Sequence, residues 1–451
     1  MKRDNQIMLR GPLLKNMISY TIPIILTGWL QLLFNAADLV VVGQANGSNS
    51  LAAVGATGAI TNLIVNLFIG LSVGAGVTVA HGLGSNDEDA VHRTVHTAIP
   101  AAAISGLFLT VVGVSLSKTF LGWMGTPENI LPLSTLYMQI YFGGMIFNMV
   151  YNFAASILRA AGDTQSPLKF LTLAGLINVG LNLIFVYVFH MNVEGVALAT
   201  AISQAVSAVL VVRTLMGRTD ACRLELKKLR IYKPQLLRMI RIGLPAGIQG
   251  SMFSISNVMI QSSINSFGDV VMSGNTAAGN IEGFIFVGMN SFHQTAVNFT
   301  GQNVGARQYD RVKRIMWTSL ASVGVAGFVM GVVVYLCGPF LLGIYINDSA
   351  EAIAYGLNRM QYICLAYFLC GMMDVSTGAL RGMGASLVPM VISVLGVCGI
   401  RLLWLATVFE AYRTPGCLYL SYSVSWIITF LAQFAAFWWV YRKHMKKAER
   451  L

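Results

Sequence analysis

Residues 157–167 read ILRAAGDTQSP, and residues 379–389, which lie 222 positions further on, read ALRGMGASLVP. The two stretches share Leu, Arg, Gly and Pro at equivalent positions. The same offset relates Pro23 to Pro245. Duplication over so long a period in an apolar chain is typical of transporters that are built from two related lobes.

Composition indicates a membrane protein. Of the 451 residues 55% are hydrophobic and only 11% are charged, and the mean hydropathy is +0.67. A soluble surface needs about 25% charged residues, so most of this surface must face lipid. No P-loop and no catalytic motif such as HExxH or GxSxG is present. The sequence therefore predicts no catalytic residues. It predicts that the protein is neither an enzyme nor an ATP-driven pump.

Cysteines and histidines show no metal-binding pattern. The six cysteines form no CxxC pair and lie mostly inside apolar runs, so we interpret them as small core residues. His92 and His96 have helical spacing but no convincing third ligand. We therefore predict no metal and no cofactor.

Twelve apolar runs are long enough to cross a hydrocarbon core of ~30 Å. Six fall in each half, and an even number returns the chain to its starting side, so the halves should be parallel repeats. The predicted fold is an all-α membrane protein with twelve transmembrane helices in two six-helix lobes. The runs are 17–42, 52–81, 92–117, 132–158, 168–189, 194–214, 238–266, 277–304, 312–338, 354–380, 386–410 and 416–441.

Basic residues predict the orientation, because cytoplasmic loops carry an excess of Lys and Arg. With both termini in the cytoplasm, 26 of the 30 Lys and Arg residues lie on the cytoplasmic side of the cell membrane. The exceptions are Lys118, Arg359, Arg401 and Arg413. This placement explains the net charge of +12 without a nucleic-acid partner.

The expected domain organisation has three parts. An N-lobe at 1–213 precedes a basic cytoplasmic linker at 214–237 and a C-lobe at 238–451. The basic stretch 213–241 suits a surface helix lying on the anionic inner leaflet of the bilayer.

A polar cluster is expected in the outer part of the N-lobe. Asp38 lies inside the first run, where a charge costs several kcal/mol unless it faces the protein interior. Asn178 and Asn182 are one turn apart in the fifth run, and the helical rise brings Thr200 of the sixth run to a similar depth. These oxygens could bind Na⁺, and the carboxylate could instead bind H⁺. The alternative is that the Asn and Thr side chains form ordinary hydrogen bonds between helices and have no role in ion binding.

Three charges in the C-lobe have two interpretations. Glu282 and Asp374 could attract a cationic substrate or carry protons, or one of them could neutralise Arg401 in a buried pair. The position equivalent to Asp38 is Ile260, so the cation site is not duplicated.

The repeated prolines, Pro23 and Pro245, lie inside predicted helices, where each removes a backbone hydrogen bond and permits a kink. Bending of the first helix could be coupled to the charge state of Asp38. A static kink is the alternative.

The chain resembles the MATE (multidrug and toxic compound extrusion) transporters over nearly its whole length. The resemblance rests on these stretches in this order: TIPIILTGWLQLLFNAADLVVVGQ, GLGSNDEDAVHRT, ILRAAGDTQSP, NVGLN, EGVALATAISQ, GLPAGIQ, NVGARQYDRVKR and ALRGMGASLVP. It implies twelve helices in two lobes and export of substrates in exchange for Na⁺ or H⁺.

Residue by residue, Asp38 matches the acid of the family's first span. Asn178 and Thr200 match the cation site of one branch, which usually has an aspartate where this chain has Asn182. Another branch has a glutamate where this chain has Ile255, so its C-lobe cation site is not expected here.

The resulting hypothesis is a secondary-active multidrug antiporter, monomeric in the bilayer, that exports amphipathic and cationic drug-like molecules by alternating access. The alternative is a flippase for lipid-linked precursors from the same superfamily, which a strongly basic cavity would favour.

Overall fold

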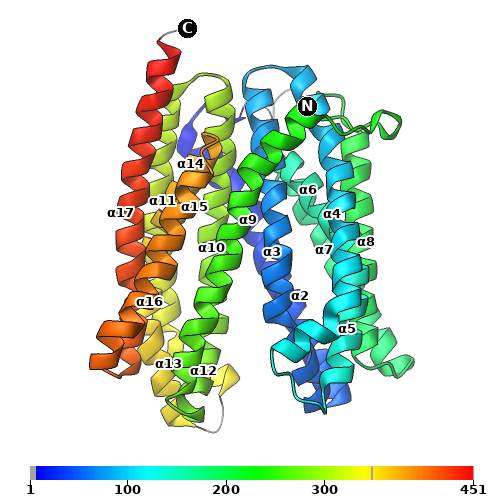
Figure 1. Ribbon diagram of the computed structural model, residues 1–451, viewed down its shortest axis with the longest axis vertical. Helices are drawn as coiled ribbons and strands as arrows, with labels where there is room; N and C mark the ends of the chain where they lie inside the picture. The colour runs from blue at the N-terminus through cyan, green and yellow to red at the C-terminus, as the bar shows by residue number, and fades with distance from the viewer. Residues whose placement is uncertain (1–6, 347–348, 450–451) are drawn as a thin grey trace. The chain divides into compact units, whose positions relative to one another are not determined.

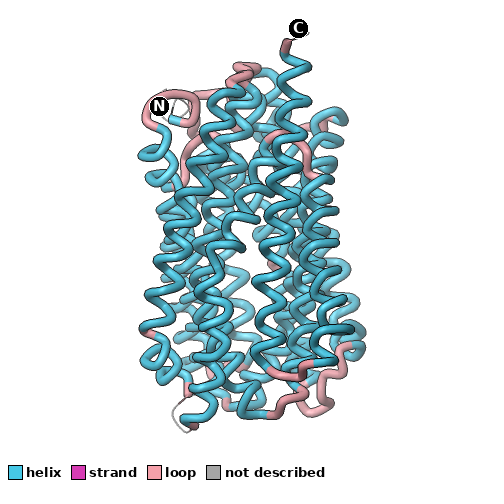
Figure 2. The backbone as a smooth tube through the Cα atoms, turned by 90° about the vertical axis from the view of Figure 1, so that its left-hand side faces the viewer, coloured by secondary structure: helices cyan, strands magenta, loops and turns pink. Residues whose placement is uncertain are grey.

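A computed structural model describes residues 7–346 and 349–449, which form helices and no strand (Figure 1). Short loops join the ends of the helices (Figure 2). The α-helices are α2 Leu13–Asn46, α3 Ser48–Gly84, α4 Glu88–Trp123, α5 Leu131–Gly143, α6 Met145–Ala160, α7 Gln165–Leu183, α8 Val193–Met216, α9 Lys233–Asn265, α10 Asp269–Gly305, α11 Tyr309–Leu336, α12 Gly338–Tyr345, α13 Ala350–Ile363, α14 Tyr367–Gly382, α15 Leu387–Ser393, α16 Ile400–Trp404 and α17 Pro415–Ala448. The π-helical turns are η1 Ile184–Val188, η4 Val394–Gly399 and η5 Leu405–Phe409, and the 3-10 turns are η2 Leu226–Lys228 and η3 Cys364–Ala366.

Most of these elements can span a membrane. Within the described ranges, nine helical stretches are long and apolar enough, and α5 with α6, which bend by 47° at Gly144, make a tenth. Helices α9 and α10 have 33 and 37 residues, so they are long enough, although more polar residues interrupt them. These two complete the predicted set of twelve, with six in each half.

Large apolar side chains on the helices are exposed. Leu176 is 62% exposed, Val111 57% and Phe328 53%. Exposed apolar surface of this kind is unfavourable in water and favourable in hydrocarbon, where each helix satisfies its own backbone hydrogen bonds. The exposed apolar side chains therefore agree with the composition, which indicated that most of the surface faces lipid.

The chain packs into two compact units. Unit 1 contains Leu26–Gly247, and unit 2 contains Met8–Ile25 together with the chain from Ile248 onward. In unit 1, α3, α4, α6 and α8 enclose buried side chains such as Phe142 and Phe153. In unit 2, α10, α11, α14 and α17 enclose another core, which includes Tyr419.

Helix α2 divides between the units. Its first half packs in unit 2, where the ring of Tyr20 meets that of Phe299 edge-on with centroids 5.4 Å apart. The hydroxyls of Thr21 and Thr295 are hydrogen-bonded at 2.7 Å. The second half belongs to unit 1, and the division falls two residues after Pro23.

Helix α9 divides in the opposite sense, with its first half in unit 1 and the remainder in unit 2. There Gly243 and Gly247 lie against Gly70 and Gly74 of α3 so closely that a Cβ on Gly74 would be 2.1 Å from a backbone oxygen of α9. The division falls two residues after Pro245. Each repeated proline therefore lies two residues before the point at which its helix passes from one compact unit to the other.

The repeat is visible in the turns of each half. Gly162 after α6 and Gly384 after α14 have φ values of 94° and 82°, a conformation that glycine adopts without steric cost. Asn86 after α3 and Arg307 after α10 both have φ of 57°, which is uncommon for residues with a Cβ. Equivalent helices therefore end in the same way in both halves, as a parallel repeat requires.

The prediction of a surface helix over 213–241 is wrong. Between α8 and α9 the chain is a loop whose only helical part is the single turn η2. Its backbone groups bond to the start of α4 instead: the Glu225 N–H donates to Nε2 of His96 at 3.0 Å, and the Tyr232 N–H donates to Oγ1 of Thr97 at 3.1 Å. These bonds replace the ones that a helix would make within itself.

The same loop holds a small buried core. Arg218 forms a salt bridge with Asp220 through Nη2 and Oδ2 at 2.5 Å, and the Cys222 N–H donates to Asp220 at 3.1 Å. Burial raises the pKa of the Cys222 thiol to about 12, so this side chain is a neutral thiol. All six cysteines lie in the described part of the chain and are free.

Candidate functional site

A carboxylate from α2, two amides from α7 and a hydroxyl from α8 meet inside unit 1. Nδ2 of Asn182 donates to Oδ1 of Asp38 at 2.5 Å and to Oδ1 of Asn178 at 3.3 Å. Oγ1 of Thr200 lies 3.4 Å from Oδ2 of Asp38 and accepts from Nδ2 of Asn178 at 3.4 Å. The structure therefore brings together all four residues that the sequence analysis grouped as a cation site.

Local helix geometry produces this cluster. Asn178 and Asn182 are one turn apart on α7, so both amides face the same neighbours, and both are buried. Two residues after Asn182 the helix widens into the π-helical turn η1. Such turns within α-helices are frequent at functional sites, where they redirect side chains.

The electrostatic setting of Asp38 is unusual. Its side chain is 8% exposed and is hydrogen-bonded to neutral groups, and no Lys, Arg or His among residues 7–346 and 349–449 forms an ion pair with it. Oδ1 of Asn182 is also buried and has no hydrogen-bond partner in that part of the chain. A buried carboxylate without a positive partner is costly, and an unpaired amide oxygen beside it adds acceptor capacity. This arrangement can accept a cation.

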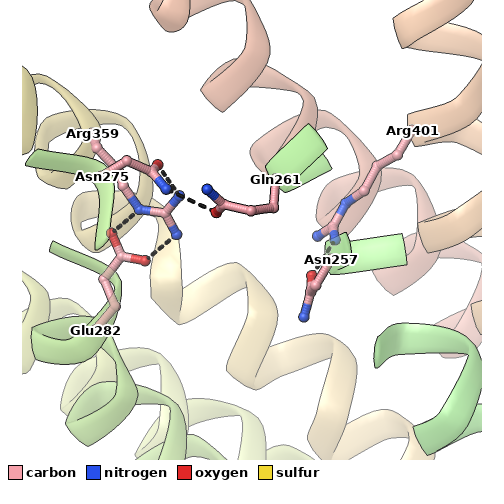
Figure 3. A network of polar contacts seen from close by, with 6 residues as sticks. All are labelled: Asn257, Gln261, Asn275, Glu282, Arg359 and Arg401. Atoms are coloured by element: carbon pink, nitrogen blue, oxygen red, sulfur yellow. Dashed lines mark hydrogen bonds and ion pairs between the residues drawn. The ribbon is translucent and has the colours of Figure 1, made fainter. Parts of the chain in front are cut away.

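In unit 2, Glu282 of α10 pairs with Arg359 of α13. Nε of Arg359 donates to Oε1 of Glu282 at 2.9 Å, and Nη2 donates to Oε2 at 2.7 Å. Nη1 donates to Oδ1 of Asn275 at 2.7 Å (Figure 3). The interpretation that Glu282 neutralises Arg401 is therefore wrong, because the facing helix α13 supplies a different arginine.

Arg401 of α16 is 4% exposed and has no acidic partner within the described ranges. Its Nε donates to Oγ of Ser425 at 3.2 Å, and its Nη1 donates to Oδ1 of Asn257 at 3.5 Å. The guanidinium carbon lies 4.1 Å from the centroid of the Tyr422 ring. A cation–π contact and neutral acceptors thus take the place of a carboxylate.

Asp374 of α14 does not pair with Arg401 either. Its carboxylate makes no ion pair among the described residues, and its backbone oxygen contacts Nδ1 of His293 at 2.6 Å. Arg381, two turns further along α14, donates to Gln249 at 2.7 Å and contacts Nε2 of His293 at 3.2 Å. The buried-pair interpretation is therefore wrong for both acids.

These charges line one cavity of about 440 Å³ within unit 2. The volume lies in the range of small-molecule sites, which are about 300–1,000 Å³. Aromatic rings and amides form much of the remaining wall. The lining includes Phe253, Asn257, Gln261, Asn275, Glu282, Phe286, Arg359, Tyr367, Asp374, Arg401, Tyr422 and Trp426.

The sequence analysis named Arg359 only as a basic residue outside the cytoplasmic loops and did not select it as a candidate functional charge. This residue lies inside the predicted span 354–380, so the criterion that selected Asp38 applied to it as well. Its partner Asn275 lies just outside the predicted span 277–304 and carried no comparable signal.

His92 and His96 have a structural role here. Their rings stack with centroids 3.9 Å apart, and Nδ1 of His96 contacts the backbone oxygen of His92 at 2.8 Å. Because Nε2 of His96 accepts from the Glu225 N–H at 3.0 Å, both ring nitrogens are engaged in holding the loop after α8.

A family model described as MatE matches residues 23–184 and 245–405, which together are more than half of the chain. The chain is 26% identical over 425 residues to "Probable multidrug resistance protein YpnP" of Bacillus subtilis (strain 168), covering 94% of this chain and 95% of that protein. It is 21% identical over 342 residues to "Multidrug export protein MepA" of Staphylococcus aureus (strain N315), covering 76% and 75%.

Solved structures are similar over nearly the full length. One is the outward-facing conformation of a multidrug resistance MATE family transporter, with a TM-score of 0.89, 20% identity and 98% of each chain covered. Another is the Vibrio cholerae MATE transporter VcmN in the bent form, with a TM-score of 0.87, 20% identity, and coverage of 96% of this chain and 98% of that one. This likeness confirms the predicted two-lobe fold of twelve transmembrane helices.

Proposed function

Because the chain belongs to the MATE family of multi-pass membrane transporters, we propose that it exports drug-like molecules as a secondary-active antiporter. The exported compounds are amphipathic cations, and the driving ion is H⁺ or Na⁺. Relatives named as multidrug resistance and multidrug export proteins support this substrate range. The balanced charge of the unit 2 cavity, with two acids and two arginines, gives the flippase alternative no support.

The observation that carries the proposal is the environment of Asp38. Among the described residues this buried carboxylate is bonded to neutral donors and forms no ion pair, so its charge is uncompensated there, which costs several kcal/mol. Binding of H⁺ or Na⁺ removes that cost, so occupancy of this site and the conformation of α2 should depend on each other. Substrate loading must then oppose cation binding by the same free energy, since coupling between two sites is reciprocal.

The identity of the cation depends on one amide. In the present arrangement Asn182 turns its NH₂ group toward Asp38, and this donor stabilises the ionised carboxylate. Na⁺ would need the amide oxygen on that side, so binding would require the amide to turn by about 180°. Asn178 and Thr200 would supply the further oxygens.

The remaining features of the proposal concern topology. Both termini lie in the cytoplasm, the protein acts as a monomer in the bilayer, and the lobes expose the substrate site alternately to the two sides. The clustering of basic residues in alternate loops supports this orientation. Fluorescent reporters fused to each end test the orientation, because a reporter that folds only in the cytoplasm should be bright at both.

The experiment that tests the function is dye transport in proteoliposomes under separately imposed H⁺ and Na⁺ gradients. Asp38→Asn should abolish the gradient-driven component while leaving dye binding in place. Asp89→Asn is the matched control, because Asp89 is a carboxylate on α4 whose side chain is 83% exposed and pairs with Arg93. Full gradient-driven transport in Asp38→Asn would refute the proposal, as would equal loss in both variants.

A further inference from the structure

The unit 2 cavity holds a buried arginine, Arg401, with which no acidic side chain of the described residues forms an ion pair. Arg401 has five N–H donors and stays protonated at any physiological pH. Only Nε and Nη1 donate hydrogen bonds in the described part of the chain, to Ser425 and to Asn257, and the latter bond is long at 3.5 Å. Figure 3 shows the guanidinium beside Asn257 and apart from the Glu282–Arg359 pair. Donor capacity therefore remains at the edge of the guanidinium, within a cavity wall.

The contact with Tyr422 leaves that edge available. The guanidinium carbon lies 4.1 Å from the centroid of the Tyr422 ring, over the face of that ring. A face contact attracts the cation but accepts no in-plane N–H bond. A carboxylate meets a guanidinium in its plane, by two parallel hydrogen bonds. Tyr422 thus holds Arg401 in place for a planar anionic partner.

Of the charged side chains that line the cavity, one acid and one arginine form no ion pair in the described part of the chain. Glu282 and Arg359 satisfy each other through two hydrogen bonds. Asp374 and Arg401 both line the cavity, and neither forms an ion pair with the other or with another described residue. Arg381 lies nearest to Asp374 along α14, but its hydrogen bonds go to Gln249 and His293.

We infer that this cavity binds aromatic zwitterions, with the carboxylate of the ligand on Arg401 and its cationic nitrogen at Asp374. The aromatic walls formed by Tyr367, Tyr422 and Trp426 suit the planar part of such a ligand. The inference rests on the proposed export function, since it names the substrate class of that exporter. The inference also narrows the proposed substrates to cations that carry a carboxylate as well, because a molecule without a carboxylate would leave the charge of Arg401 unbalanced.

A pair of dyes tests the inference. One is a rhodamine with a free benzoate, which is a zwitterion, and the other is its methyl ester, which is a cation of nearly the same shape. Binding to the purified full-length protein is followed by fluorescence anisotropy without any ion gradient. The wild type should bind the free acid about tenfold more tightly than the ester, as expected for a charge-assisted hydrogen-bonded pair.

Two substitutions should remove that preference by different routes. Arg401→Gln deletes the cation. Asn257→Asp keeps the shape of the side chain and places a carboxylate beside Nη1 of Arg401, so the arginine is neutralised from within. In both variants the affinity for the acid should fall to that for the ester. Arg413→Gln, which removes an exposed arginine outside the cavity, should keep the tenfold preference.

Arg401→Lys should keep part of the preference, because it retains the charge and loses the planar pair of donors. Equal affinity of the wild type for acid and ester would overturn the inference, as would an undiminished preference in Asn257→Asp. The outcome is separable from the proposed function. If the acid preference holds but proteoliposomes export neither dye, the export proposal fails and the ligand assignment stands.

Discussion

Arg359 donates hydrogen bonds to both carboxylate oxygens of Glu282, from Nε at 2.9 Å and from Nη2 at 2.7 Å. The two residues lie on α13 and α10, and both are buried. This pairing decides the charge of the unit 2 cavity, because it uses up one acid and leaves Arg401 without an acidic partner in the described ranges. The free charges of the cavity are therefore Arg401 and Asp374.

The Glu282–Arg359 pair should behave as a unit in stability. Glu282→Leu or Arg359→Met alone leaves a buried charge unpaired and should cost about 3–5 kcal/mol. The double variant should cost much less than the sum, because neither charge remains. Thermal unfolding of the four proteins in detergent measures the coupling.

The exposed pair Glu410–Arg413 provides the control for that cycle. Its side chains are 59% and 66% exposed, so the same substitutions there should change stability by less than about 1 kcal/mol. Strictly additive effects of the two changes at Glu282 and Arg359 would contradict the prediction.

Two neighbours of Asp38 should differ in importance. Asn182→Leu removes the short bond to Oδ1 and should slow cation-driven transport about tenfold or more, since a hydrogen bond to a charged group contributes about 1.5–3 kcal/mol. Thr200→Val should have a smaller effect, because that hydroxyl already donates to the Val196 oxygen at 3.0 Å and lies 3.4 Å from Asp38. Initial rates in proteoliposomes, normalised to protein content, test this order. A larger loss in Thr200→Val would show that the carboxylate depends on the hydroxyl instead.

The close crossing of α3 and α9 should tolerate no side chain. A Cβ at position 74 would lie 2.1 Å from the backbone oxygen of Met239, so Gly74→Ala must separate the helices and should cost about 1–3 kcal/mol. Gly55→Ala on the same helix meets nothing within 4 Å and should be neutral or stabilising by up to about 1 kcal/mol. Unfolding temperatures of the two variants provide the comparison. Equal unfolding temperatures for Gly74→Ala and Gly55→Ala would mean that α3 and α9 can separate without loss of stability.

The proline in α2 should matter for transport more than an ordinary helical proline. Pro23→Ala restores a donor at the point where α2 changes unit, and it should reduce gradient-driven transport several-fold with little loss of dye binding. Pro100→Ala in α4 is the matched control, since that proline also lies inside a helix and α4 belongs wholly to unit 1. Transport rates and dye affinities of both variants would be measured together. If Pro100→Ala reduced transport equally, the role assigned to Pro23 would have to be withdrawn.

Much of the proposed cation site followed from the sequence because it depends on helical geometry. Asn178 and Asn182 had to share a face, being four residues apart, and the rise per residue brought Thr200 to a similar depth as Asp38. The sequence left the hydrogen bonds open. Only the tertiary structure shows that Asn182 turns its NH₂ group toward the carboxylate and that its own oxygen lacks a partner in the described chain.

The expected pairing in unit 2 failed for a related reason. Glu282, Asp374 and Arg401 were recognised as buried charges from hydropathy, which is a property of one segment at a time. Which acid meets which arginine depends on the neighbouring helices and on the rotation of each helix about its axis. Arg359 reached Glu282 from α13, and Tyr422 of α17 took the place opposite Arg401.

The sequence by itself determined the twelve spans, their duplication and the presence of a buried acid in the first one, because span length and helical periodicity are local properties. Only the tertiary structure decided that α2 and α9 divide between the compact units beside Pro23 and Pro245, and that Arg401 keeps an unbalanced charge. Both outcomes depend on contacts between segments far apart in the chain, and their free energies arise only when the helices pack.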